Sequence, residues 1–165
     1  MMVRLERAVP ARLAEVDALF DRLSGYSRAV DGVGRRAGAA REFVTAVPPG
    51  RTAMHKHAFI LSDEDGTFGL LDIIEDHPVD GTAFIGLFAI AEDRHGVGLG
   101  RAAWLEAERF AAGTLGARTL RLGVVSANPV IGFWRRMGFT ETGETSAYVG
   151  EARTSPIVIM EKTIE

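Results

Sequence analysis

The sequence has no cysteine among its 165 residues. This absence excludes disulfide bonds, thiolate metal ligands and catalysis through a nucleophilic cysteine. Long hydrophobic runs are missing too, since no segment approaches the roughly 18 uninterrupted apolar residues that a membrane-spanning helix requires. The first residues lack the basic and then apolar layout of a secretory signal peptide. We therefore expect a cytoplasmic protein that makes no membrane contact.

Positive charge is not in excess either. The chain has 19 lysines and arginines against 22 aspartates and glutamates, for a formal net charge of −3 and a pI near 5.8. Sequence-independent binding to nucleic acid requires a broad basic face, so we expect no nucleic-acid partner and only a local anion site. The length and the 47% hydrophobic content predict a single domain over residues 1–165, which can bury about 70% of its unfolded surface.

The most informative stretch covers residues 94–101, which read Arg-His-Gly-Val-Gly-Leu-Gly-Arg. It joins an apolar, strand-like run at residues 83–90 to a helical pattern that begins near Leu99. Glycines at alternate positions let the backbone turn tightly and present its N–H groups to a phosphate, and the following helix adds the positive end of its dipole. The pattern predicts an anion site, and the alternative is a glycine-rich turn that begins an ordinary helix.

Two known phosphate-binding patterns fit this loop poorly. A Walker loop ends in Gly-Lys-Ser or Gly-Lys-Thr, and the chain contains neither triplet. A dinucleotide loop fits at Gly98, Gly100 and Ala103, but it requires an acidic residue at the end of the next strand to bind the ribose. The next strand-like run ends at Val125 and is followed by Ser-Ala-Asn. A nicotinamide-linked enzyme is therefore a minor alternative.

From His95 onward, the loop resembles the acyl-CoA loop of the GNAT (GCN5-related N-acetyltransferase) superfamily, which reads Gln or Arg, two residues, Gly, one residue, and Gly or Ala. The family's second landmark is a strand, an asparagine and a helix that ends in Phe-Tyr-x-x-x-Gly-Phe. Here the strand covers residues 119–125, the asparagine is Asn128, and residues 133–139 read Phe-Trp-Arg-Arg-Met-Gly-Phe. Both landmarks stand in the family's order, and the close match covers about residues 82–139.

This resemblance implies a cosubstrate and a set of binding residues. In the family, the fourth and fifth strands splay apart, and the pantetheine arm of acetyl-CoA lies in the gap. By resemblance, the backbone of Phe88, Ala89 and Ile90 bonds to that arm, and Asn128 and Phe133 line it from the fifth-strand side. The pyrophosphate is then bound by the loop, which comprises His95, Gly96, Val97, Gly98, Leu99, Gly100 and Arg101.

The chain departs from the family pattern at two positions. His95 replaces the usual glutamine or arginine, which matters little where backbone amides bind the phosphate. Trp134 replaces the tyrosine that in many members protonates the departing thiolate, and an indole N–H donates a hydrogen bond without titrating usefully. Because a thiol of pKa near about 8.5 leaves readily, we expect slower transfer rather than none. Tyr148 is a replacement candidate, because the resemblance implies that the sixth strand neighbours the fifth, and the alternative is a half-buried strand tyrosine.

Acyl transfer to an amine also requires a group that takes the proton of the ammonium. Asp72 lies within the apolar run at residues 70–74, where an ionised group is costly unless it is functional or hydrogen-bonded. Glu75, Asp76 and His77 end the same run, and either face the site or belong to a solvated turn. We therefore take Asp72 and Glu75, together with Tyr148, as the candidate catalytic residues.

The order of the elements follows from hydrophobic periodicity and turn residues. An Asp-Gly pair at residues 65–66 predicts a tight hairpin, and the antiparallel stretch over residues 58–90 argues against a doubly wound fold. The order predicts an α+β protein and matches the GNAT layout, in which about four helices flank a mixed, largely antiparallel sheet of about seven strands, splayed between strands four and five. We expect strands at residues 3–9, 58–61, 67–74, 82–90, 119–125, 139–149 and 156–162, and helices after Pro10, near residues 36–46, and at residues 99–112 and 129–137.

The resemblance implies an N-acetyltransferase that moves the acetyl group of acetyl-CoA directly to a primary amine of a small molecule or peptide. The alternative is an acyl-CoA-binding regulatory protein with little or no turnover, which Trp134 leaves open. Homodimers are common in the family, so a homodimer is one expected assembly. His55 and His57 would share a face of an extended strand, as metal ligands do, but they lack a third ligand, and we expect no metal.

The acceptor is the part of the reaction that the sequence specifies least. In the family, it is chosen by the segments that correspond here to residues 25–50 and 148–156. Arg35, Arg36 and Arg41 could attract an acidic acceptor, or could form a solvated basic helix face.

Overall fold

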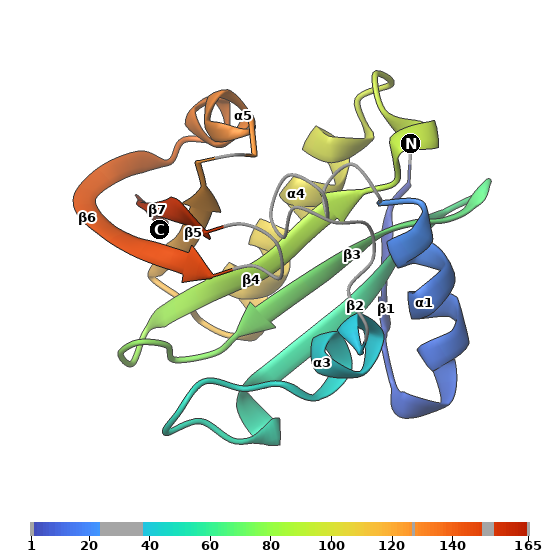
Figure 1. Ribbon diagram of the computed structural model, residues 1–165, viewed down its shortest axis with the longest axis horizontal. Coiled ribbons are helices and arrows are strands. Elements are labelled where there is room, and N and C mark those ends of the chain that lie inside the picture. The colour runs from blue at the N-terminus through green and yellow to red at the C-terminus, as the bar shows by residue number, and fades with distance from the viewer. Residues whose placement is uncertain (1, 24–37, 127, 150–153, 165) are drawn as a thin grey trace.

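A computed structural model describes residues 2–23, 38–126, 128–149 and 154–164. Within these ranges the chain forms one seven-stranded sheet with the order β1-β2-β3-β4-β5-β7-β6 (Figure 1). Of the six strand pairs, the β4–β5 pair is parallel and the others are antiparallel, which confirms the mixed, largely antiparallel sheet. The strands are β1 (Arg4–Arg7), β2 (Lys56–Asp63), β3 (Gly66–Ile74), β4 (Thr82–Ile90), β5 (Thr119–Val125), β6 (Thr140–Val149) and β7 (Thr154–Thr163).

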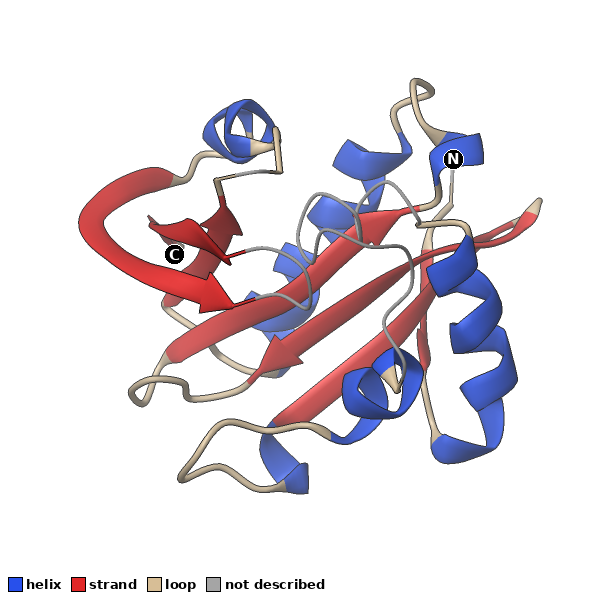
Figure 2. Ribbon diagram, viewed as in Figure 1, coloured by secondary structure: helices blue, strands red, loops and turns tan. Residues whose placement is uncertain are grey.

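Helices cover both faces of the sheet (Figure 1, Figure 2). On one face lie α1 (Leu13–Asp21) and α3 (Ala39–Thr45). On the other lie α5 (Ile131–Arg136) and α4 (Leu99–Arg109), which continues into a π-helical turn, η4 (Phe110–Thr114). Short 3-10 turns complete the described part of the chain: η1 (Pro10–Arg12), η2 (Ala53–His55) and η3 (Glu92–Arg94). Among the described helices, none is long and apolar enough to cross a membrane.

Each face of the sheet buries its own apolar layer, because successive strand side chains point to opposite faces. On the α1 side, Phe20 of α1 packs in one cluster with Leu70 of β3. On the α4 side, Trp104 of α4 packs in a second cluster with Leu71 of β3. Both faces of β3 are therefore covered, which explains its nearly continuous apolar sequence. Asp72 is the one charged residue of this strand, and it is 8% exposed.

The sheet opens between β4 and β5. The two strands pair only from Thr82 to Ile85 on β4 and from Thr119 to Leu122 on β5. The register between β3 and β4 shifts at the same level, because Asp72 lies opposite Leu87 and the next residue of β3 lies opposite Ile85, so that residue 86 is a bulge. A β-bulge bends its strand and leaves backbone groups unpaired. The expected splay between the fourth and fifth strands is thus confirmed.

The expected place of the sixth strand is wrong. β7, not β6, lies beside β5, and it pairs with β5 along the whole length of that strand. Tyr148 of β6 lies opposite Ser155 of β7, one strand further from the splay. The physical reason is burial: β7 carries buried residues such as Ile159 and Met160, whereas residues 141–147 of β6 are exposed. The more apolar strand of this hairpin takes the inner position.

Element ends differ from expectation more than element positions do. β4 and β5 have the expected bounds, and α4 begins at Leu99 as expected. α5 is shorter than the helix expected at residues 129–137. The helix expected near residues 36–46 is α3, and residues 36 and 37 lie outside the described ranges.

Candidate functional site

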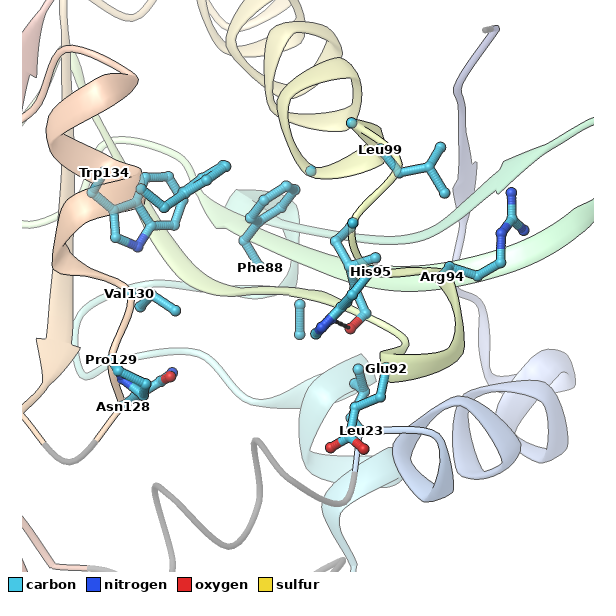
Figure 3. A pocket seen from close by; sticks show the side chains of 16 residues that line it. Leu23, Phe88, Glu92, Arg94, His95, Leu99, Asn128, Pro129, Val130 and Trp134 are labelled. Carbon is cyan, nitrogen blue, oxygen red and sulfur yellow. Dashed lines mark hydrogen bonds between the residues drawn. The ribbon is translucent and has the colours of Figure 1, made fainter.

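A cavity of about 630 Å³ lies where β4 and β5 separate (Figure 3). Its walls are the end of β4, the glycine loop at residues 94–101, and the residues around the start of α5. Two predicted cofactor residues, Val97 and Arg101, are exposed and lie outside its described lining. The other predicted cofactor residues all line it: Phe88, Ala89, Ile90, His95, Gly96, Gly98, Leu99, Gly100, Asn128 and Phe133.

The glycine loop has the conformation that its sequence predicts. Gly96 and Gly98 have φ values of 81° and 82°, in the left-handed region that favours glycine. Gly98 is the N-cap of α4 and caps it with no side chain, so the first-turn amides are available to a ligand. A Cβ on Gly100 would lie 3.4 Å from Cε1 of Phe133. The loop and α5 therefore approach each other closely across the cavity.

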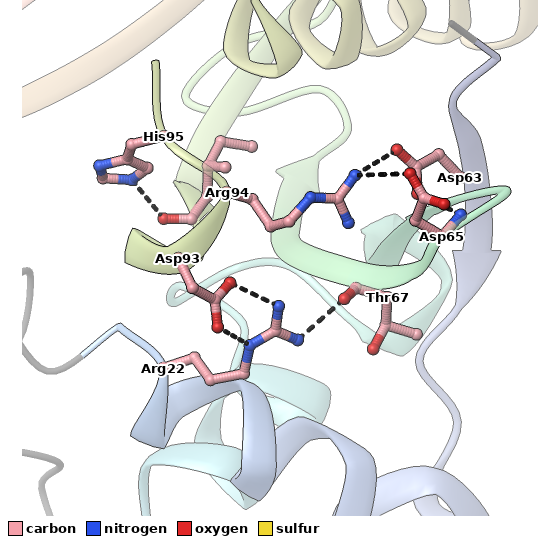
Figure 4. Close-up of polar contacts among 8 residues, drawn as sticks. Arg22, Asp63, Asp65, Thr67, Asp93, Arg94 and His95 are labelled. Carbon is pink, nitrogen blue, oxygen red and sulfur yellow. Dashed lines mark hydrogen bonds and ion pairs between the residues drawn. The ribbon is translucent and has the colours of Figure 1, made fainter. Parts of the chain in front are cut away.

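His95 ties the loop back to β4. Its Nε2 lies 2.7 Å from the carbonyl oxygen of Ile90, so the imidazole N–H donates to that oxygen (Figure 3, Figure 4). The bond bridges the strand end and the loop across η3. The imidazole thus fixes the entry of the glycine loop and occupies the carbonyl of one of the three predicted strand partners.

Two arginines fasten η3 to the rest of the protein (Figure 4). Arg94 places Nη2 2.6 Å from Oδ2 of Asp63, which is 3% exposed at the end of β2. Arg22, just after α1, donates from Nη2 and Nε to the two oxygens of Asp93, at 2.7 and 3.0 Å. Burial raises the pKa of Asp63, but hydrogen bonds from Arg94 and from the Asp65 amide outweigh it and lower the pKa overall. Arg94 therefore acts as an anchor for the loop.

An aromatic cluster closes the α5 side of the cavity. Trp134 is 6% exposed, and its ring meets that of Trp104 at 90° with centroids 4.9 Å apart. Phe88, Phe133 and Phe139 pack edge-on against the same indole. Trp134 also lines the gap between β4 and β5. Trp134, the residue that departs from the tyrosine of the resembled pattern, is thus a packed indole.

A small pocket of about 60 Å³, which we call the passage, lies between β4 and β5. It shares Phe88 and Trp134 with the first cavity, and Gly86 and Gly123 with a further cavity on the opposite side of the sheet. A Cβ on Gly86 would lie 2.5 Å from Oδ2 of Asp72, and a Cβ on Gly123 would lie 2.8 Å from Cγ2 of Ile157. Glycine at both positions keeps the passage open.

The cavity on the opposite side has a volume of about 540 Å³. It lies between α1 and α3 on one side and the splayed ends of β4, β5 and β7 on the other. We call it the acceptor cavity, after the role that we propose for it. Its described lining is mainly apolar, and Asp72, Lys56 and His77 are among its polar members. The passage therefore shares lining residues with a cavity that contains the glycine loop and with a cavity that contains a carboxylate.

Asp72 is the central charged group of the acceptor cavity. Its Oδ1 lies 2.9 Å from Nζ of Lys56, whose side chain is 7% exposed. Burial raises the pKa of Asp72 to about 6, although the charge of Lys56 opposes the shift. Such a carboxylate is mostly ionised at neutral pH and still holds a proton well enough to act as a general base. The placement of Asp72 thus fits the proton-accepting role that its sequence position suggests.

The residues that follow Asp72 divide between the two faces of the sheet. Glu75 bonds through Oε1 to Nε2 of His57 at 2.9 Å, and the His57 ring packs against Phe110 on the α4 side. Glu75 is thus outside the described lining of the acceptor cavity. His77 lines that cavity, and its pKa is lowered by burial and by nearby arginine charges. Asp72 and His77 thus both line the acceptor cavity, whereas Glu75 lies on the α4 side of the sheet with His57.

Several predicted residues lie outside what the structure describes. The backbone of Tyr148 lies in β6, but its side chain is not described. Arg35 and Arg36 lie outside the described residues, and so do residues 150–153. Ser146 of β6 does line the acceptor cavity, which places part of the expected acceptor-selecting hairpin beside it.

The two histidines considered as metal ligands have separate roles. His55 ends η2, where its Nδ1 accepts a hydrogen bond from the Thr52 amide at 3.2 Å. His57 is held by Glu75 and by Arg7, whose Nη1 lies 2.9 Å from Nδ1. Within the described part of the chain, no group of three or more histidines, aspartates or glutamates is placed to hold a metal ion.

Three residues of the site escaped the sequence reasoning. Lys56 pairs with Asp72 because β2 and β3 are antiparallel neighbours. No local sequence pattern predicts this contact. Gly86 and Gly123 did leave a signal, since an isolated glycine within an apolar strand often marks a bulge or a close approach. Both lie in such strands, and both line the passage.

Comparisons with known proteins agree with this geometry. The family model described as the acetyltransferase (GNAT) family matches residues 34–139. An acetyltransferase from Thermus thermophilus is 26% identical, with 99% of this chain and 98% of that chain covered and a TM-score of 0.76. The structure of spermidine N-acetyltransferase from Vibrio cholerae in complex with CoA and spermine has 16% sequence identity to this chain. The match covers 98% of this chain and 95% of that chain, with a TM-score of 0.69. A GNAT-family acetyltransferase from Streptococcus pneumoniae is 19% identical, with 99% and 100% covered and a TM-score of 0.69. A comparison with curated proteins gave no match.

Proposed function

The chain belongs to the GNAT family of acetyltransferases, and on that premise we propose that it transfers the acetyl group of acetyl-CoA directly to a primary amine. The observation that carries the proposal is the pair of cavities on opposite sides of the sheet, with the glycine-lined passage between β4 and β5 sharing lining residues with both. One contains a glycine loop at the start of a helix, and the other contains Asp72 with a pKa near 6. A reaction in the passage would meet an anion site on one side and a base on the other. We take residues 1–165 to act as one domain.

In this proposal, the larger cavity holds acetyl-CoA. The amides of the glycine loop and of the first turn of α4 bind the pyrophosphate, and the ends of β4 provide backbone partners for the pantetheine arm. Asn128 and Phe133 line the arm from the α5 side. Support comes from the left-handed glycines and the uncapped helix start, and from the Vibrio cholerae neighbour, whose structure contains CoA.

Asp72 is assigned to proton transfer. An ammonium has no lone pair, so it must lose a proton before it attacks, and Asp72 takes that proton directly or through water. The amine nitrogen then forms a bond to the thioester carbonyl carbon, and a backbone amide of β4 near the bulge donates to the resulting oxyanion. The C–S bond breaks as the tetrahedral intermediate collapses, and the second proton that the nitrogen loses passes through water to the departing thiolate. Of the predicted catalytic residues, Asp72 is the one whose described side chain lines the acceptor cavity.

In this scheme, the thiolate leaves without a dedicated side-chain proton donor. A thiol with a pKa of about 8.5 departs readily, and Trp134 offers at most a hydrogen bond. The same residue favours the second candidate function, an acyl-CoA-binding regulatory protein with little or no turnover. Turnover therefore separates the two candidates, whereas cofactor binding is common to both.

The test is a calorimetric titration of acetyl-CoA, NADH and ATP into the wild type and into Gly98→Glu, followed by assays of thiol release with amines. We expect micromolar binding of acetyl-CoA alone, lost in the variant because its carboxylate repels the pyrophosphate. Gly116→Glu is the matched control, since Gly116 also has a positive φ and open space around it. Failure of acetyl-CoA to bind would remove both candidates, and binding of NADH instead would favour a nicotinamide-linked enzyme. Binding without thiol release for any amine would favour the regulatory protein.

A further inference from the structure

Lysine is scarce in this chain. Of its 19 lysines and arginines, two are lysines, Lys56 and Lys162, and they lie on opposite faces of the sheet. Lys56 begins β2 and lines the acceptor cavity. Lys162 of β7 pairs with Glu108 of α4 on the other face. One of the two lysine amines is therefore in the cavity to which we assign the acceptor.

The ammonium of Lys56 lies against the proposed base. Its Nζ is 2.9 Å from Oδ1 of Asp72. The other carboxyl oxygen, Oδ2, is directed at Gly86, where it would lie 2.5 Å from a Cβ. Gly86 lines the passage. One carboxyl group thus separates the amine of Lys56 from the passage in which we propose that the acetyl group reacts.

Open space adjoins this amine. The acceptor cavity, of about 540 Å³, is lined by Lys56, Asp72 and Gly86 together. A flexible four-carbon stem carries the ammonium of a lysine. The ring of Phe43, whose centre is 5.8 Å from Nζ, adds an aromatic wall that attracts a cation. The amine can therefore advance from Asp72 toward Gly86 within the cavity.

We propose that Lys56 is a site of self-acetylation, at which the protein transfers the acetyl group of its own bound acetyl-CoA to Nζ. The inference rests on the proposed function and names a residue of this chain as one acceptor. Asp72 takes a proton from the ammonium, and Nζ forms a bond to the thioester carbonyl carbon. The C–S bond breaks, and the second proton that Nζ loses passes through water to the thiolate. The products are free CoA and an uncharged amide, which no longer forms an ion pair with Asp72.

The test incubates the protein with deuterated acetyl-CoA and no added amine, and peptide mass spectrometry follows the label over time. Lys162 is the internal control. Its side chain is 25% exposed and that of Lys56 is 7% exposed, so chemical acetylation from solution favours Lys162. We expect Lys56 to acquire the label at least tenfold faster than Lys162, because its amine lies beside the base and the passage. A smaller difference, or no label at Lys56, would overturn the inference.

Two further measurements test whether the acetyl group comes from acetyl-CoA bound to the same molecule. In a Gly98→Glu protein that no longer binds acetyl-CoA, labelling of Lys56 should slow at least tenfold, whereas the matched control Gly116→Glu should label as the wild type does. The fraction of wild-type Lys56 labelled per minute should not change with protein concentration. Unchanged labelling in Gly98→Glu, or a rate proportional to protein concentration, would contradict self-acetylation. The wild-type comparison of the two lysines remains decisive if a variant does not fold.

Thiol release with free amines, measured in parallel, separates this inference from the proposed function. Release with a free amine and no label at Lys56 would overturn the inference and leave the transferase in place. Label at Lys56 without release for any free amine would uphold the inference and limit acetyl transfer to the protein's own lysine. Failure of acetyl-CoA to bind, measured by calorimetry, would overturn both.

Discussion

The carboxyl group of Asp72 combines burial with a nearby partner of opposite charge. Removing its charge while keeping its shape tests the proposed base. We expect Asp72→Asn to lower kcat by about 10²–10⁴-fold, the usual contribution of a general base. The Kd for acetyl-CoA should stay within about twofold, because Asp72 is on the acceptor side of the passage. Steady-state kinetics and calorimetry measure the two quantities.

Glu75→Gln provides the contrast, because Glu75 bonds to His57 on the other face of the sheet. Its kcat should change by less than about threefold, in keeping with a position away from the reaction. A larger loss of kcat in Glu75→Gln than in Asp72→Asn would indicate that Glu75, not Asp72, is the general base.

The pKa of Asp72 sets the acidic limb of the pH profile. The base must be ionised to accept a proton, and its pKa is raised to about 6, so kcat/KM should rise with pH through about 6 and then level off. Lys56 lowers that pKa through its positive charge. In Lys56→Met, which keeps an unbranched side chain, the limb should move to higher pH. A limb that stays in place would show that another group limits the rate.

Trp134 can be tested by restoring the hydroxyl that many family members carry. Trp134→Tyr and Trp134→Phe remove similar bulk from the aromatic cluster around Trp104, and each should cost about 1–3 kcal/mol of stability. Only the tyrosine can donate a proton to the thiolate. We expect kcat of the Tyr variant to exceed that of the Phe variant by about tenfold at saturating substrates, measured by thiol release. Equal values would mean that thiolate departure does not limit turnover.

Residues whose role is local were the ones that the sequence predicted well. Gly96 and Gly98 adopt left-handed backbone, and a glycine pattern before a helix is enough to expect this. The pairing of Lys56 with Asp72 joins two strands through the sheet register, and Glu75 turns to the opposite face. The pairing is not evident from the neighbouring residues because it depends on strand register, whereas the opposite face of Glu75 follows from the alternation of side chains along an extended strand.

At the level of elements, η3 joins β4 to the glycine loop, and its anchors can be tested. Arg94→Gln leaves buried Asp63 without its closest cation, so the position of the loop should become less fixed. We expect the Kd for acetyl-CoA to increase about tenfold, measured by calorimetry. Asp63→Asn should have a similar effect on affinity, and the double variant should lose less than the sum of the two, as expected for one shared interaction. Additive losses would indicate that the two side chains act separately.

The elements themselves were largely predictable. β4 and β5 match their expected bounds because each is a short apolar run between turn residues. Helix ends were less predictable: the end of α4 passes into the π-helical turn η4, and Leu115 closes that turn by donating to the Phe110 carbonyl. Such ends depend on packing and on backbone bonds that hydrophobic periodicity does not reveal.

For the whole molecule, the order of strands was the main error. The sequence pattern identified the two closing strands but not which of them pairs with β5. Burial decides this, because β7 supplies Ile159 and Met160 to the core. The consequence is functional: β7, through Ile157 and Ile159, forms a wall of the acceptor cavity. The splay was expected from the resemblance, and the bulge at Gly86 lies where the pairing of β4 with β5 ends.

Because the passage lies between the two cavities, a substitution in it can test acetyl transfer separately from acetyl-CoA binding. Acetyl-CoA at 100 times its Kd should stabilise the wild type by about 2.7 kcal/mol, which for a domain of this size raises Tm by about 5–11 °C. A Cβ on Gly123 would lie 2.8 Å from Ile157 and narrow the passage without reaching the glycine loop. Gly123→Ala should therefore keep most of the Tm increase, measured by calorimetry, and lose at least tenfold in kcat. Loss of both would mean that the cofactor itself occupies the space beside Gly123, and full activity would mean that the acetyl group does not pass between β4 and β5.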